Sequence, residues 1–517
     1  MYATPLPSLR FREAASFRLP LDALFGRRGS RDSQRTHHRQ LSDSIQSRAM
    51  AQIYPFRALR YDTNKVELAD VVTQPYDKIT PEMQERYYAL SPYNLIRVIL
   101  GKTGPQDTDA DNVYTRAAAT LNEWRSESIL KEEPEPALYG YAQTYTVPGT
   151  DEVRTRRGFI GLGQLYDYED KVVFRHEQTF PKHKSDRLAL FKATRTYCEQ
   201  IYMLYSDPEF LVEEIVFGSK NGEDHPADLS VTDEYGVEHR VWKLTDPAKL
   251  RRVVEALRGK PLIIADGHHR YETSTAYMHE RAKELGLDED TVLPKDDAGA
   301  PAEGTSLPSP AFPEAAMMMT FVNRDAPGIT ILPTHRVVFG LPEFSGSEFA
   351  LRATEYFQVS EIPHTEDRGC RQDPAKLLKR LDETPCTAFV AVTHDADYLL
   401  IPHVEQTEAL LGSIPEQLRA LDVTQLHKLV LEKLLGLSEE TIRSGSNVRY
   451  VRDAGDAMEQ VGRGEANIAF LIKPVTLEQM AQVSLNLEVM PQKSTDFYPK
   501  LLSGLAMYAL DNAPSQP

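Results

Sequence analysis

The feature that most constrains the fold is the stretch PLIIADGHHRYETSTAYMHERAKEL, residues 261–285. Its large aliphatic residues at 262–264 predict a buried strand that ends at Asp266. Gly267 allows a sharp turn there and a close approach of a ligand to the backbone. Apolar residues then recur at helical spacing as far as Leu285, so one face of a helix packs into a core. The chain therefore places a strand, a tight turn and a helix in direct succession.

Strands and helices interleave along the rest of the chain, which predicts an α/β or α+β fold. Short apolar or alternating runs predict strands at residues 94–100, 137–147, 157–166, 200–207, 261–266, 315–325 and 466–474. Thr80 as an N-cap with Pro81 at the first position predicts a helix at residues 81–90. Further helices are predicted at residues 109–130, 184–196, 246–258, 268–285 and 423–435.

A chain of 517 residues is too long for one ordinary core, so more than one domain is expected. We predict an N-terminal α/β domain over residues 50–340 and a C-terminal α+β domain over residues 341–510. Residues 286–314 are rich in Asp, Gly, Pro and Ala and show no periodicity, which predicts a long mobile loop. Residues 511–517 are expected to form a disordered tail.

The first 49 residues differ from the rest in composition. They carry nine arginines, no lysine and four acidic residues, and they show little periodicity. This composition predicts a disordered tail, although an organellar transit peptide has a similar composition. A third interpretation is that translation starts at Met50, where the patterned sequence MAQIYPFRALRYD begins.

Charge and cysteine content exclude several classes of protein. The formal net charge is −17, and an acidic chain argues against general nucleic-acid binding, which needs a basic surface. No apolar run approaches the roughly 20 residues that span a bilayer, so no membrane association is expected. Cys198, Cys370 and Cys386 lie far apart and form neither a metal spacing nor a disulfide framework. Sparse cysteines are typical of the reducing cytoplasm, where we expect the protein.

The DGHHR motif at the predicted turn has the chemistry of an anion site. The free N–H groups at the start of a helix, together with the helix dipole, attract phosphate or carboxylate. Arg270 adds a forked donor suited to either group. Asp266, His268 and His269 could act as acid, base or metal ligand. The tripeptide His-His-Arg also occurs at residues 37–39, where no predicted strand precedes it. The prediction of a functional site at residues 268–270 therefore depends on the strand, the aspartate and the glycine that precede them.

A second cluster of charged residues lies in the stretch RHEQTFPKHKSDRLALFKATR, residues 175–195. Its candidates for binding an anionic substrate are Arg175, His176, Lys184 and Arg187. Glu177, near a predicted strand end, is the candidate general base. The alternative interpretation is a solvated charged loop.

Further candidate residues are polar groups next to apolar segments, and they are Asp77, Asn94, Arg97, His335, Arg336, Lys493, Ser494 and Thr495. Each has a structural alternative. Asp77 could form an Asx-turn, and an arginine inside an apolar strand, such as Arg97, could be paired without binding substrate. Residues 493–495 could form the N-cap of an apolar helix. The chain has no G-x-S-x-G, H-E-x-x-H or post-strand G-x-G-x-x-G motif, which removes the common hydrolase, zinc-protease and dinucleotide interpretations.

The sequence resembles the domain-of-unknown-function 1015 family of bacterial and archaeal proteins over residues 53–506. The matching stretches, in order, are PFRALRYD, VVTQPYDKI, SPYNLIRV, FRHEQTFPKHKSDRLALFKATR, IYMLYSD, IIADGHHRYETS, ILPTHRVV and MPQKSTDFYPKLLSG. The family name implies little about activity.

The DGHHR unit is also similar, over about 15 residues, to free-serine kinases with the ParB/sulfiredoxin-like fold. This resemblance implies a ParB/sulfiredoxin-like core in which the helix N-terminus binds nucleotide phosphates. Sulfiredoxins carry a catalytic cysteine directly after the glycine. Here that position is His268, which argues against sulfinic-acid chemistry. The basic DNA-binding helices of the partitioning proteins are absent from this acidic chain.

Three functions follow as hypotheses. The first is an enzyme of phosphoryl transfer or phosphoester chemistry on a small hydroxylated metabolite such as serine or phosphoserine, with Mg²⁺ and ATP or ADP as cofactors. Its ligand would be a small phosphorylated molecule, held by residues 267–270, with Glu177 or Asp266 as the base. The sequence does not choose the direction of reaction or the oligomeric state.

The second hypothesis is a metal-dependent hydrolase with Asp266, His268, His269 and either His176 or His335 as ligands. Against it, adjacent histidines at a helix start point about 100° apart. The third is a non-catalytic switch or scaffold that binds a nucleotide without turning it over.

Overall fold

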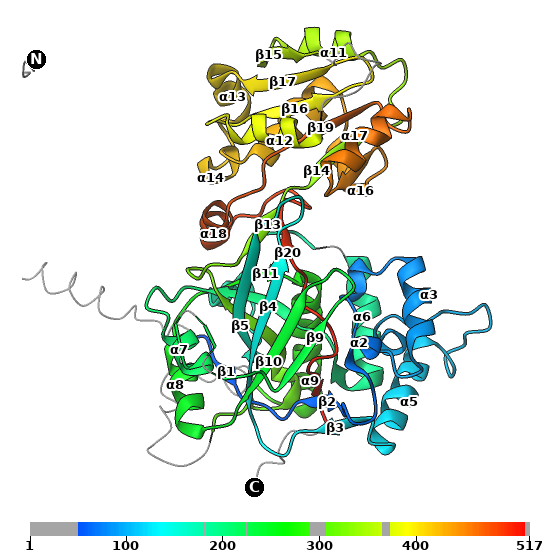
Figure 1. Ribbon diagram of the computed structural model, residues 1–517, viewed down its shortest axis with the longest axis vertical. Helices are drawn as coiled ribbons and strands as arrows, with labels where there is room; N and C mark the ends of the chain where they lie inside the picture. Colours follow the sequence, from blue (N-terminus) through cyan, green and yellow to red (C-terminus); the bar gives the residue numbers. More distant parts are fainter. Residues whose placement is uncertain are drawn as a thin grey trace, which may run out of the picture. The chain divides into compact units, whose positions relative to one another are not determined.

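A nine-stranded mixed sheet carries the segments that surround the DGHHR motif (Figure 1). The computed structural model describes residues 50–179, 181–220, 222–223, 225–288, 307–363 and 373–511, without the side chains of residues 181–183. The tail predicted at 1–49, most of the loop predicted at 286–314 and residues 512–517 of the predicted C-terminal tail lie outside the described residues.

The strand order of this sheet is β6-β11-β8-β12-β5-β4-β10-β9, and β1 also pairs with β5. The bounds are β1 Ile53–Tyr54, β4 Leu138–Thr146, β5 Val153–Gln164, β6 Val173–Phe174, β8 Ile201–Tyr205, β9 Leu229–Thr232, β10 Glu238–Leu244, β11 Leu262–Asp266 and β12 Ala316–Asn323. Only β11–β6 and β12–β8 are parallel pairs among these strands. All eight residues of β12 are buried, as expected for a continuous apolar run in the middle of a covered sheet.

Helices lie on either side of this sheet (Figure 1). On one side, α7 (Leu211–Phe217) packs on α8 (Pro247–Leu257). A second group of helices consists of α5 (Val113–Ser126), α6 (Pro181–Thr194) and α9 (His268–Leu285), in which α6 contacts both of the others. The fold is therefore a mixed α/β structure, as the interleaved pattern predicts.

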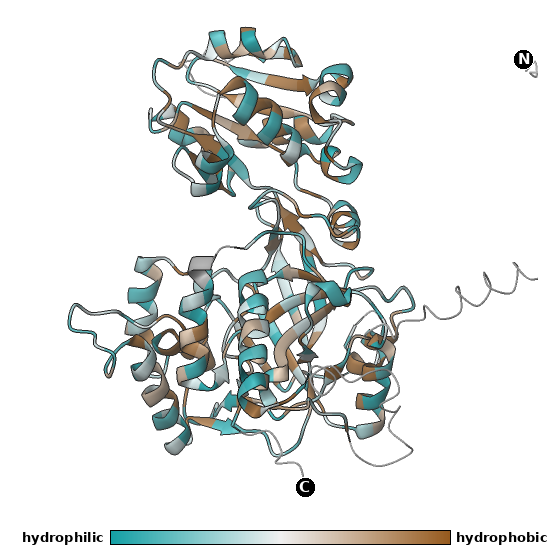
Figure 2. Ribbon diagram, turned by 180° about the vertical axis from the view of Figure 1, so that it is seen from behind, coloured by the Kyte–Doolittle hydropathy of each residue, from teal (hydrophilic) through white to brown (hydrophobic). Residues whose placement is uncertain are grey.

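A second, six-stranded antiparallel sheet has the order β15-β17-β16-β19-β14-β18. Its strands are β14 His335–Val338, β15 Phe357–Ile362, β16 Phe389–Val392, β17 Asp397–Pro402, β18 Val448–Val451 and β19 Ile468–Leu471. Val337 and Val338 belong to different apolar clusters because successive side chains of a strand point to opposite faces. Figure 2 shows apolar residues along the strands of both sheets and polar residues on the helix surfaces.

The last 35 described residues return to the core of the first sheet. Helix α18 (Leu477–Leu485) contributes Met480 to it, β20 (Asp496–Tyr498) pairs with β13 (Thr330–Leu332), and β21 (Tyr508–Ala509) pairs with β7 (Thr196–Tyr197). The division into domains at residue 340 stays a prediction. No helix in the described part of the chain has the length and apolar character needed to cross a bilayer.

The strand predicted at residues 94–100 is wrong, because residues 96–99 form the short helix α4 (Ile96–Ile99). The Asn94 side chain accepts a hydrogen bond from the Ile96 N–H and donates one to the Asp70 carbonyl, which starts a helical turn. Arg97 then lies over the Tyr88 ring and donates to the Tyr88 carbonyl. A short apolar run does not distinguish a buried strand from a buried helix.

The helix predicted to follow residues 493–495 is also wrong, since the chain enters β20 instead. Lys493 adopts a left-handed conformation with φ of 54°, which turns the chain. The next residues pair with β13, and the residue before Pro499 is disfavoured in a helix.

A buried glutamate makes the stability of this fold depend on pH. Glu213 on α7 is 3% exposed, and burial, with the nearby charges of Asp207 and Asp325, raises its pKa to about 7. The folded protein therefore keeps a proton that the unfolded chain has lost, between the ordinary glutamate pKa and pH 7. The stability that this proton provides is present at low pH and is lost as the pH rises through 7.

We predict that Glu213→Gln removes this loss. Relative to the unmodified protein, the variant should gain on the order of 3 kcal/mol between pH 5 and pH 8, measured by chemical denaturation. Glu214→Gln, on the exposed face of the same helix, is the matched control and should show no such gain. Parallel pH profiles for Glu213→Gln and the unmodified protein would contradict the prediction.

Candidate functional site

The turn between β11 and α9 has the geometry of an anion site. Gly267 is the N-cap of α9 and has φ of 96°, in the left-handed region that favours glycine. A Cβ atom at this position would also lie 3.2 Å from the Arg270 guanidinium. The N–H groups of the first helical turn have no partner within the helix, and the positive end of the helix dipole lies beside them.

This turn opens into a cavity of about 370 Å³. The cavity is lined by six short segments of the chain, and their lining residues are Tyr76, Asp77, Lys78, Glu177, Gln178, Ala265, Asp266, Gly267, His268, His269, Arg270, Thr334, Tyr450, Arg452, Lys493, Thr495, Asp496 and Lys500. Residues separated by more than 400 positions in sequence thus converge on the start of α9.

The floor of the cavity is a chain of buried ion pairs. The Lys500 ammonium lies 3.0 Å from Asp266 Oδ1 and 3.1 Å from Asp496 Oδ1. Arg270 Nη2 lies 2.9 Å from Asp266 Oδ2, and Nη1 of the same guanidinium donates to the Gln200 carbonyl. Burial alone would raise the pKa of Asp266, but the charges of Lys500 and Arg270 outweigh burial and hold this pKa well below its ordinary value. Asp266 is therefore a fixed anion that orients two cations.

The walls of the cavity carry further positive charge. Arg452 forms an ion pair with Asp496 at 2.5 Å, and Lys78 lies 4.0 Å from the same carboxylate. The pKa of Lys78 is lowered, first by the neighbouring charge of Lys500 and then by burial. Five cationic and four acidic side chains line the cavity in all, and this balance favours an anionic ligand.

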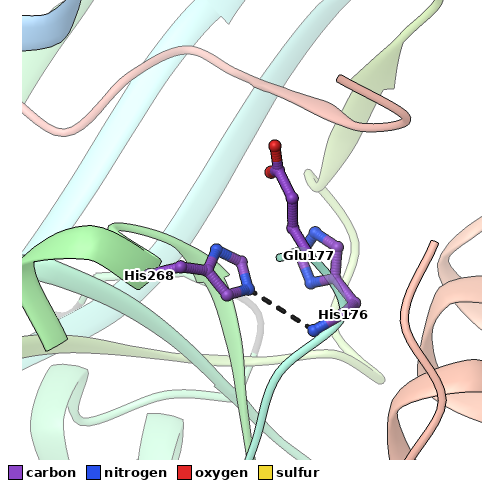
Figure 3. Close-up of side chains that lie close together, drawn as sticks. All are labelled: His176, Glu177 and His268. Carbon is purple, nitrogen blue, oxygen red and sulfur yellow. Dashed lines mark hydrogen bonds between the residues drawn. The ribbon is translucent and has the colours of Figure 1, made fainter. Parts of the chain in front are cut away.

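His176 lies beside Glu177 and His268, two residues that line the cavity, and the ligand atoms of the three all fall within 4.8 Å of one another (Figure 3). The His176 N–H donates to His268 Nε2 at 3.4 Å, and His176 Nε2 lies 2.8 Å from Thr495 Oγ1. Burial lowers the pKa of His176 to about 4 and that of His268 well below its ordinary value, so both rings are neutral. Two neutral imidazoles and a carboxylate are a donor set that a transition metal could use.

Glu177 differs from the other carboxylates of the cavity. Burial raises its pKa above the ordinary glutamate value, and the positive charge of Lys493 opposes this only in part. Its Oε1 accepts the Lys493 N–H at 3.4 Å. A partly buried carboxylate with a raised pKa, in a cavity, has the properties of a general base.

Nine of the eighteen residues predicted for the site line the cavity: Asp77, Glu177, Asp266, Gly267, His268, His269, Arg270, Lys493 and Thr495. Two more of the predicted residues do not line the cavity but contact residues that do. His176 contacts Thr495, and the Arg336 side chain donates to the Lys493 carbonyl at 3.2 Å. Arg336 thereby holds the loop that presents Lys493.

The remaining seven lie elsewhere and make structural contacts. Arg175 and Lys184 both pair with Glu272. Arg187 is buried over the Tyr76 ring, and His335 Nδ1 accepts the Ile472 N–H. Ser494 donates to the Pro491 carbonyl, and Asn94 and Arg97 belong to the start of α4 as described above.

Sequence reasoning missed four charged residues of the cavity: Lys78, Arg452, Asp496 and Lys500. Three of them stand inside motifs that were already singled out, PYDKI and MPQKSTDFYPKLLSG. Lys500 follows a tyrosine and a proline, and nothing in that local sequence predicts its ion pair with Asp266, 234 positions away. Arg452 belongs to none of these motifs. It directly follows β18 (Val448–Val451) and lies at the cavity because that strand ends there.

A model of the family described as protein of unknown function DUF1015 matches residues 53–424. The match covers more than half of the chain, so the chain belongs to this family. No curated protein matches it significantly.

Several solved structures are similar to this chain at low identity. A free serine kinase in complex with AMP is 13% identical with a TM-score of 0.29, covering 63% of this chain and 83% of that chain. A conserved hypothetical protein from Pyrococcus furiosus is 12% identical with a TM-score of 0.29, covering 66% and 93%. SbnI with a C-terminal truncation, from Staphylococcus aureus, is 11% identical with a TM-score of 0.30, covering 69% and 90%. At these values none of them decides what this chain does.

The ion pairs of the cavity floor predict a large effect of Lys500→Met on stability. The substitution leaves the carboxylates of Asp266 and Asp496 buried without their shared cation, and we expect a loss of about 3 to 5 kcal/mol at pH 7 by chemical denaturation. The loss should shrink towards pH 4, where the two carboxylates can take up protons. Lys493→Met, at an exposed lysine of the same cavity, is the control and should cost about 0.5 kcal/mol or less. Equal effects of the two substitutions would refute this account of the floor.

Proposed function

We propose that this member of the DUF1015 family transfers a phosphoryl group between a nucleotide and the hydroxyl group of a small metabolite, of which serine is the best candidate. One observation carries the proposal. A single cavity combines the N-terminus of α9, cations in excess on its walls and a glutamate with a raised pKa. These are the parts that positioning and charge neutralisation require in phosphoryl transfer.

The phosphates would lie at the start of α9. The N–H groups of the first turn and the helix dipole provide donors and positive potential there. Lys78, Lys493 and Arg452 line the same cavity and would neutralise charge on the phosphate oxygens. Arg270 is held by Asp266 and the Gln200 carbonyl, so its charge would act on the phosphates while its position stays fixed.

Glu177, and not Asp266, would be the general base. Asp266 is occupied by Lys500 and Arg270, and its lowered pKa makes it a poor proton acceptor. Glu177 would take the proton of the acceptor hydroxyl while that oxygen forms a bond to phosphorus. The bond between phosphorus and the bridging oxygen breaks, and the nucleotide leaves with its electron pair. The reverse reaction uses the same groups, with protonated Glu177 as the acid.

The proposal includes a magnesium ion. Mg²⁺ is usually held by one or two carboxylates together with substrate phosphates, and Asp77 is an exposed carboxylate on the cavity wall. Asp77 would hold the ion, which when bound would neutralise charge on the phosphates.

We expect the unmodified protein to form phosphoserine from serine and ATP or ADP in the presence of Mg²⁺, followed by ³¹P NMR. Glu177→Gln should lower kcat by about 10² to 10⁴ while nucleotide affinity stays within a few-fold. In the unmodified protein, the rate should rise with pH through the raised pKa of Glu177, because the base must be ionised.

The matched control is Glu123→Gln, at an exposed glutamate on α5, which should leave the rate unchanged. Nucleotide binding without turnover under all conditions would contradict phosphoryl transfer and favour the nucleotide-dependent switch. Activity that needs Zn²⁺ or Mn²⁺ and no nucleotide would instead favour a metal-dependent hydrolase built on His176, Glu177 and His268.

A further inference from the structure

A second cavity, of about 230 Å³, adjoins the first. Gln178 and Tyr450 line both, and the segment that presents Lys493 to the first cavity provides Val489 to Gln492 to the second. A ligand that extends past Gln178 and Tyr450 would contact both cavities.

The second cavity differs in chemistry from the first. No aspartate lines it, and its walls include the apolar side chains of Ile414, Leu418, Ile442 and Met490. Its charged lining residues are Lys428, Glu432, Glu439 and Arg443, two of each sign. The Lys428 and Glu432 groups lie 2.8 Å apart and neutralise each other. An uncharged group with apolar faces is the complementary ligand.

Polar groups inside this cavity are suited to the edge of a flat, hydrogen-bonding ring. Thr424 is 5% exposed, and its hydroxyl oxygen has no hydrogen-bond partner among the described residues. His427 Nε2 accepts a hydrogen bond from Arg336 Nε at 3.3 Å, so that nitrogen carries no proton. A buried hydroxyl without a partner costs free energy that a ligand with a matching group would recover.

The helix that provides part of this wall has an unusual geometry. Residues 426–434 form the π-helix η4 (Leu426–Leu434), directly after α15 (Asp422–Gln425), and the Leu435 N–H donates to the carbonyl of Val430, five residues earlier. The helix predicted at 423–435 is thus present with a wider turn. π-Helices are rare and occur frequently at functional sites. Here the π-helix presents His427 and Lys428 to the cavity.

We infer that the second cavity binds the base and ribose of the nucleotide whose phosphates occupy the first. This inference rests on the proposed function. The acceptor hydroxyl must lie near Glu177 in the first cavity, and a small acceptor such as serine has no apolar part that would fill 230 Å³. A nucleoside has flat apolar faces, polar edges and no charge, which match the apolar walls, the Thr424 hydroxyl and a lining with equal numbers of cationic and acidic side chains.

The test compares a ligand that has a base with one that lacks it. Isothermal titration gives the affinities of the full chain for ADP and for pyrophosphate, each with Mg²⁺. We expect ADP to bind at least about tenfold more tightly than pyrophosphate. Ile414→Trp, which fills the second cavity from a half-buried position, should reduce the ADP affinity to that of pyrophosphate and leave pyrophosphate binding unchanged.

Two further variants separate cavity filling from general damage. Ile401→Trp fills another cavity, lined by Ile401, Pro402 and Val404, from a similarly half-buried position and should change neither affinity. Thr424→Val removes only the buried hydroxyl and should weaken ADP binding several-fold without affecting pyrophosphate.

The outcomes distinguish the two proposals. If neither ADP nor pyrophosphate binds, the proposed function and this inference both fail. If ADP binds and is turned over but Ile414→Trp and Thr424→Val leave its affinity unchanged, only the assignment of the second cavity fails. A rise in the KM for the acceptor with unchanged ADP affinity would also overturn the assignment, because it would place the acceptor there.

Discussion

The buried ammonium of Lys500 between Asp266 and Asp496 is the interaction on which the site depends. It joins the end of β11 to the segment after β20, two parts of the chain that lie 234 positions apart in the sequence. Burial alone would lower the pKa of Lys500, but the two carboxylates outweigh burial and hold this pKa above its ordinary value. The charged form is therefore stable in the interior, and the β11–α9 turn stays beside the loop of Lys493.

This arrangement divides the charged groups of the cavity by role. Asp266 and Asp496 are fixed in ion pairs with Lys500, Arg270 and Arg452, so they shape the cavity and accept no proton. Glu177 keeps a raised pKa, since burial affects it more than its neighbouring cations do. Two carboxyl groups in one cavity thus acquire opposite proton affinities from their surroundings, which is how acid–base roles are commonly separated in active sites.

What the sequence predicted correctly was mostly local. The strand, glycine turn and helix at residues 261–285 follow from adjacent residues, and the structure has β11, Gly267 and α9 there. The errors at the site came mainly where pairing is distant. Residues after 493 form β20 because β13 pairs with them, and His176 meets Thr495 across 319 positions. No local sequence pattern predicts such contacts. For the same reason, Arg175 and Lys184 were predicted to bind substrate, whereas both form ion pairs with Glu272.

The most direct test of the central claim is a crystal structure of the protein with ADP and Mg²⁺. The account predicts phosphate oxygens within hydrogen-bond distance of the backbone N–H groups of His268 and His269, with Lys78 and Lys493 beside them. Phosphates bound elsewhere, with the start of α9 facing only solvent, would contradict it.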